Sequence, residues 1–123
     1  MTYIQQIQNA TDADALAALI AAEGIAVKER LIRDMDLRLA AFRTHAAHRA
    51  AKARYEAEID NILGQLRTAW QMANDGTPEW RDTLTGWIEA HEPRAFRWPS
   101  KEGHDRAVRL RLIVQHAPQH ATT

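Results

Sequence analysis

Apolar residues recur every three to four positions along most of this chain, which is the spacing of one face of an α-helix. The first such stretch follows Thr11, whose hydroxyl can cap a helix, and carries Leu16 and Ile20 on one face. Gly24 comes after this stretch, and glycine is typical of the position just past a helix end. The pattern therefore predicts a short helix at about 12–23.

The longest apolar pattern fills residues 26–74, where the sequence has no proline and Gly64 is the only glycine. Its apolar positions form two stripes, rotated from each other by roughly a third of a turn, and the change of phase falls within residues 44–54. The first stripe comprises Val27, Leu31, Met35, Leu39, Phe42, Ala46 and Ala53, and the second comprises Tyr55, Ile59, Ile62, Leu63, Leu66 and Trp70. Either one helix buries two faces against different partners, or the chain breaks and forms a helical hairpin. An unbroken helix would be about 75 Å long and would need a second chain to cover it.

Turn chemistry at Gly76 ends this pattern and begins the next. Pro78 suits the first position of a helix, where its missing N–H has no helical partner. Trp80 and Trp87 then follow on one face. We predict a helix at about 78–90 with these tryptophans, like Trp70 before them, in the core.

The C-terminal apolar pattern alternates with basic residues over Val108–Leu112. Alternation with β-branched neighbours favours a strand at about 107–115, paired with a second strand at about 95–98. A helix at about 104–115 is the competing interpretation. Residues 118–123 are expected to form a frayed tail.

The predicted fold class is therefore mainly α, with a long helix or helical hairpin, short flanking helices and a small C-terminal β-hairpin. Residues 1–76 form the helical part, and residues 77–123 hold the short helix, the basic hairpin and the tail. An isolated β-hairpin is marginal in water, so this one must pack on a helix or pair across a dimer.

The chain has 123 residues, and its 16 Lys and Arg residues balance its 16 Asp and Glu residues, but these charges are segregated into blocks. Residues 37–55 carry net charge +5 with no acidic residue, and residues 93–123 carry +4. Residues 1–36 and 56–92 carry −3 and −6. Because fields in salt act over about 8–10 Å, a partner senses the nearest block rather than the total. Alternatively, unlike blocks pair with each other inside a folded hairpin or dimer.

Several functional classes have no support in the composition. The chain has no cysteine, which excludes disulfides, thiolate metal sites and a cysteine nucleophile. No apolar run reaches the roughly 18–20 residues of a membrane span, and the N-terminus lacks the pattern of a secretory signal, so we expect a cytoplasmic protein.

Candidate catalytic groups are sparse as well. Ser100 is the only serine and lacks the glycine-framed turn of a nucleophile. His45 and His48 have metal-ligand spacing, but their neighbours are cationic. Glu56 and Glu58 are two positions apart on a helix and point in different directions. We therefore expect no enzyme, no metal and no cofactor.

Basic residues clustered in two segments are the feature that points most clearly to a function. Within residues 37–55 they surround a predicted helix on several sides, and unpaired charges of this kind must face water, phosphate or an acidic partner. Near the C-terminus, arginines flank an aromatic residue that can stack on bases. The predicted nucleic-acid-binding residues are Arg43, Arg49, Lys52, Arg54, Arg97, Trp98, Arg109 and Arg111.

Residues 34–74 resemble the long helical segment of the phage Gam-type host-nuclease inhibitors. The resemblance begins with Asp34-Met35-Asp36 and Leu39, which are followed by an Ala/Arg-rich middle. It continues in the second half of the segment with Tyr55, Ile59, Leu63, Leu66, Ala69-Trp70 and Ala73-Asn74. The resemblance implies a dimer that encircles DNA ends and blocks exonucleases.

Three hypotheses remain open from the sequence. The first is a non-enzymatic, homodimeric DNA-binding protein of phage or mobile-element type that shields DNA or inhibits a host nuclease. The second is a protein–protein interaction module whose basic segments dock on an acidic surface of a host nucleic-acid-processing complex. The third is a purely structural coiled-coil component. Phosphate and acidic protein surfaces require the same basic residues, so the sequence does not separate the first two.

Overall fold

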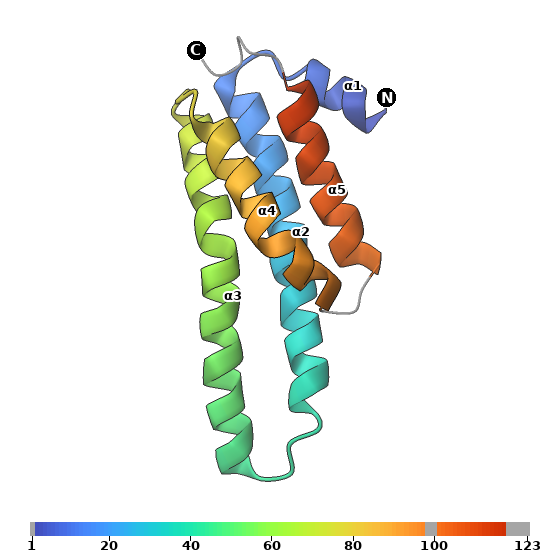
Figure 1. The fold of residues 1–123 in the computed structure, drawn as a ribbon, viewed down its shortest axis with the longest axis vertical. Coiled ribbons are helices and arrows are strands. Elements are labelled where there is room, and N and C mark those ends of the chain that lie inside the picture. Colours follow the sequence, from blue (N-terminus) through green and yellow to red (C-terminus); the bar gives the residue numbers. More distant parts are fainter. Residues whose placement is uncertain (1, 98–100, 118–123) are drawn as a thin grey trace.

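The structure is a computed structural model that describes the backbone of residues 2–97 and 101–117, and the side chains of residues 2–91 and 106–117. Within these residues it consists of five helices and no strand, so the mainly α prediction is confirmed. They are α1 (Tyr3–Gln8), α2 (Ala13–Leu39), α3 (His45–Asn74), α4 (Trp80–Arg97) and α5 (Lys101–His116). Helices α2 and α3 form a long hairpin, with α4 and α5 packed along its upper part and α1 beside the end of α5 (Figure 1).

Helix α2 is longer than predicted, because it runs through Gly24 instead of ending there. A Cβ atom at Gly24 would lie 3.4 Å from Leu66 Cδ2, so the glycine marks a close approach of α2 to α3. The helix starts one residue later than expected, since Asp12 rather than Thr11 accepts the capping hydrogen bond from Ala15 N at 2.7 Å. Packing against α3 outweighs the cost of about 1 kcal/mol that glycine carries inside a helix.

The hairpin alternative is correct, but the break between α2 and α3 lies at residues 40–44, just before the predicted range of 44–54. The chain leaves α2 at Ala40, and Thr44 caps α3 by accepting a hydrogen bond from Ala47 N at 3.2 Å. The predicted helices at 12–23 and 26–74 are therefore replaced by α2 and α3. Most of the two stripes now pack against each other within one chain, while Ala46, Ala53 and Trp70 remain exposed.

Helix α4 begins at Trp80, two residues later than predicted, and also ends later than expected. Gly76 adopts φ 75°, which favours glycine, and Thr77 N donates to Met72 O at 2.8 Å. The predicted end near residue 90 is wrong, because the helix continues through Pro93 to Arg97. A proline inside a helix loses one hydrogen bond, and the packing of α4 against both α3 and α5 outweighs that local preference.

The predicted β-hairpin is wrong, and the competing helix is correct. Residues 107–115 lie in α5, and residues 95–97 of the other predicted strand lie in α4, while Trp98 falls outside the described residues. Ala107, Leu110 and Ile113 are buried at helical spacing, so α5 packs one face against α2, α4 and α1. Tertiary packing overrides the β preference of the valine and isoleucine residues. The predicted tail at 118–123 also lies outside the described residues.

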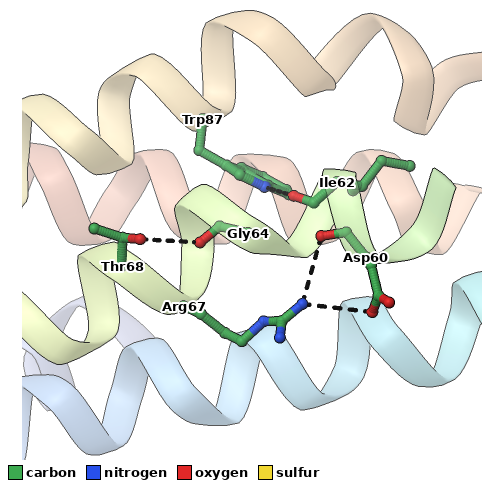
Figure 2. Close-up of polar contacts among 6 residues, drawn as sticks. All are labelled: Asp60, Ile62, Gly64, Arg67, Thr68 and Trp87. Atoms are coloured by element: carbon green, nitrogen blue, oxygen red, sulfur yellow. Dashed lines mark hydrogen bonds and ion pairs between the residues drawn. The ribbon is translucent and has the colours of Figure 1, made fainter. Parts of the chain in front are cut away.

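The core lies where α4 and α5 cover the hairpin. Trp80 and Trp87 are buried as predicted, and the indole N–H of Trp87 donates to the carbonyl of Ile62 on α3 (Figure 2). Trp70, also expected in the core, is instead 36% exposed. The opposite end of the hairpin, residues 35–55, projects past α4 and α5 and is called the arm below (Figure 1).

Candidate nucleic-acid interface

The arm consists of two helix ends and the turn that joins them. Met35, Leu39 and Ala51 fill the seam between its helices, and Phe42 and Tyr55 pack partly against this seam. Only side chains along this narrow seam are sheltered, so most other positions of the arm face water. The segment from Leu37 to Tyr55 contains no acidic residue. Any cation on the arm therefore has few anionic neighbours along the chain.

Four of the predicted nucleic-acid-binding residues lie exposed on the arm: Arg43, Arg49, Lys52 and Arg54. Arg49 Nη2 lies 2.5 Å from His45 Nε2, and Lys52 Nζ lies 3.8 Å from Glu56 Oε1. The Arg54 guanidinium lies 5.2 Å from the centre of the Tyr55 ring. Exposed contacts of this kind are worth at most about 1 kcal/mol each. These side chains therefore reach an external anion at little cost.

The local fold adds to this positive surface. The N-terminus of α3 lies at the end of the arm, and its first turn contains no acidic residue. The unpaired N–H groups of a helix N-terminus carry about half a positive charge, which favours anions. Arg43 directly precedes the Thr44 cap. The arm thus combines side-chain and backbone positive charge at one end of the molecule.

Arg109 is partly exposed, but its guanidinium is engaged by contacts within the protein. Its Nε lies 2.7 Å from Glu23 Oε1, and Arg106 Nη1 lies 3.0 Å from Glu23 Oε2. The Arg109 guanidinium also lies 3.8 Å from the centre of the Tyr3 ring. Burial and the charge of Glu23 raise the pKa of the Tyr3 hydroxyl above its ordinary value. This cluster joins α1, α2 and α5.

The remaining predicted residues are not gathered on the arm. Arg111 is partly buried on α5 and has a partner within the chain. Arg97 lies at the end of α4, but its side chain is not described, and Trp98 lies outside the described residues. Of the two basic segments, the structure therefore places only the first on the arm, where Arg43, Arg49, Lys52 and Arg54 are each exposed.

The buried Glu23 cluster was not among the sites predicted from the sequence. A glutamate before Gly24 fitted the end of a predicted helix, so its burial was not considered. Glu23 nevertheless shares the helical phase of Leu16, Ile20 and Val27, which line the core-facing side of α2. A glutamate at a core-facing position of a helix is a sequence signal for a buried ion pair, because a buried charge requires a partner.

Other candidate chemistry has little support among the described residues. They contain no group of three His, Asp or Glu side chains placed to hold a metal ion. The helices that the structure describes include none with the length and apolar character to cross a membrane. His45 contacts Arg49 instead of pairing with His48.

Comparisons of the chain with protein-family models, with curated protein sequences and with solved structures found no match.

Proposed function

We propose that this chain is a non-enzymatic DNA-binding protein whose arm contacts the phosphate backbone. The observation that supports this most strongly is the exposure of Arg43, Arg49, Lys52 and Arg54 on a projecting arm without acidic residues between Leu37 and Tyr55. Arginine and lysine supply affinity for phosphate that does not depend on base sequence. The binding surface is expected to work on any duplex.

A finer proposal concerns what this binding achieves. We propose a homodimer that shields DNA or inhibits a host nuclease, as in a phage or mobile element. The resemblance of residues 34–74 to the Gam-type nuclease inhibitors supports this, since that resemblance implies a dimer acting at DNA ends. Under this proposal linear DNA is the preferred ligand.

The proposal is tested by fluorescence anisotropy with a short labelled linear duplex at two salt concentrations. Four phosphate contacts predict that affinity falls by roughly 150-fold between about 50 and 200 mM salt, because each contact releases about 0.9 counterion. Unlabelled linear duplex and closed circular DNA are then added as competitors. Competition by linear DNA alone would support action at ends, and equal competition would leave a general DNA-binding protein.

The absence of binding at low salt would contradict the proposal. The same arm would then suit an acidic protein surface, the second hypothesis, because carboxylates and phosphates accept the same hydrogen bonds from arginine. Capture of a nuclease complex by the wild-type chain but not by an R49E/K52E variant would identify that function.

A further inference from the structure

The hairpin has one side covered by α4 and α5 and another side that carries an open apolar groove. Ile20, Gly24, Leu63 and Leu66 line this groove, which encloses about 250 Å³ between α2 and α3. Ile25 and Trp70 line it as well and remain 60% and 36% exposed. The groove is thus an apolar surface that the described part of the chain leaves in contact with water.

The apolar surface continues along α2 as a second stripe, separate from the one that packs inside the chain. Ala18, Ala21, Ile25 and Ile32, with the exposed cation Lys28 between the two isoleucines, follow one another at alternating spacings of three and four residues. This is the heptad spacing by which a helix packs along a neighbouring helix. Ile25 and Ile32 are both among the large apolar side chains exposed in the structure. Helix α2 therefore has a seam prepared for one more helix.

The rim of the groove carries charges of both signs. Arg67 Nη2 lies 3.5 Å from Asp60 Oδ1 and 3.4 Å from the Asp60 carbonyl, on the side of α3 next to α2 (Figure 2). Both side chains are exposed, so this pair is weak and can exchange partners. A surface with paired opposite charges around an apolar centre is suited to a partner with the same arrangement.

Helix α3 is electrically polarised along its length. Its first ten residues, 45–54, contain Arg49, Lys52 and Arg54 and no acidic residue. Residues 55–75 have net charge −3. Two copies of α3 side by side therefore attract in the antiparallel orientation, where unlike halves meet, and repel in the parallel orientation.

We propose that the groove side of the hairpin binds a second copy of this chain in antiparallel orientation, with the two-fold axis crossing the groove at Ile25 and Leu63. Residues that lie equally far from this axis on its two sides face each other in the dimer. Ile32 is therefore opposite Ala18 of the second copy, a large side chain against a small one. To within one residue, Arg67 is opposite Asp60 and Lys52 is opposite Asp75 of the second copy. The dimer closes on itself, because each contact occurs twice.

This dimer engages Lys52 but leaves Arg43 and Arg54 of the proposed nucleic-acid surface free. The nine positions between Arg54 and Leu63 turn α3 by about 180°, so Arg54 points away from the groove side. Arg43 lies in the turn before α3 begins. The dimer does not depend on nucleic-acid binding, and its tests contain no nucleic acid.

Disulfide mapping tests the orientation directly, because the natural chain has no cysteine. Lys52→Cys and Asn74→Cys substitute exposed positions that lie at equal distances on either side of Leu63. The antiparallel dimer predicts that oxidation cross-links a mixture of the two variants and leaves each variant alone uncross-linked. Cross-linking of each variant with itself would show a parallel dimer and overturn the proposal, as would the absence of any cross-link in the mixture.

Sedimentation equilibrium tests the surface with a matched pair of variants. Ile25→Glu places a charge in the seam and is expected to raise the dimer dissociation constant by about thirtyfold or more. Leu37→Glu is the control, because Leu37 is 73% exposed on the same helix but lies about 120° around it from Ile25. Circular dichroism checks that both variants keep the wild-type helix content. Equal association of the two variants, or a wild-type chain that stays monomeric up to sub-millimolar concentration, would overturn the proposal.

Discussion

The buried carboxylate of Glu23 provides the sharpest test of how this fold is held together. Glu23 is 3% exposed, and its two oxygens accept hydrogen bonds from Arg109 and Arg106 on α5. Glu23→Gln keeps the shape of the side chain but removes its charge. Removal of one partner from a buried ion pair costs about 3–5 kcal/mol. Because the two arginine side chains are 36% and 39% exposed and regain water, we expect a loss of about 2 kcal/mol.

Urea unfolding followed by circular dichroism measures this loss. With a slope of about 2 kcal/mol per molar urea, the midpoint is expected to fall by about 1 M. Glu29→Gln is the matched control, since Glu29 is exposed on the same helix and its neutralisation should change stability by less than about 0.5 kcal/mol. Equal midpoints for the two variants would refute the assignment of Glu23 as the link between α2 and α5.

Three further variants follow from the structure and are measured by the same urea midpoints. Gly64→Ala is expected to stabilise the protein by about 0.5–1 kcal/mol, because a Cβ atom there meets nothing within 4 Å and alanine favours helix; destabilisation would contradict this. Gly76→Ala is expected to destabilise by about 1–2 kcal/mol, since φ 75° strains any residue with a Cβ atom; an unchanged midpoint would count against that turn. The pKa of Tyr3 is raised in the folded protein, so its neutral hydroxyl contributes stability that is lost as pH rises above about 10. Tyr3→Phe should remove a fall of up to about 1.4 kcal/mol per pH unit in that range, and an identical alkaline fall in both proteins would disprove it.

Local signals in the sequence predicted a helical region and left a hairpin as one of two alternatives, without the limits of its helices. The shift of phase between two apolar stripes indicated a possible break within residues 44–54, because the stripes face different directions on one helix. The chain breaks just before that range, at residues 40–44. The end of α2 was predicted wrongly because of Gly24. A glycine that permits close packing against Leu66 cannot be distinguished in the sequence from one that ends a helix. Only the partner helix distinguishes the two cases.

The C-terminal part shows where local preference fails. Valine and leucine alternate with arginine over residues 108–112, which is the pattern of a strand with one buried face. Ala107, Leu110 and Ile113 are spaced three apart, which fits the buried face of a helix equally well. The choice depends on the apolar surfaces of α2 and α4, which bury the helical set. The short helix α1 was not predicted either, since its six residues bury only Ile7.

The candidate site was likewise predictable only where it depends on local sequence. Exposure of Arg43, Arg49, Lys52 and Arg54 followed from the density of cations, because unpaired charges stay in water. The engagement of Arg109 with Glu23 did not follow, since the two residues are 86 positions apart and meet only through the packing of α5 on α2. Local sequence patterns do not indicate which elements far apart in the chain will contact each other.

The salt dependence of DNA affinity in arm variants tests the central proposal most directly. Arg43→Gln/Arg54→Gln removes two cations from the arm outside the proposed dimer contact. Arg33→Gln/Arg111→Gln removes the same charge from α2 and α5, outside both the arm and the groove, as a control. We expect the slope of log affinity against log salt to become less steep by about two in the arm variant and to keep its wild-type value in the control. Equal slopes for the two variants would contradict the assignment of the arm as the DNA-binding surface.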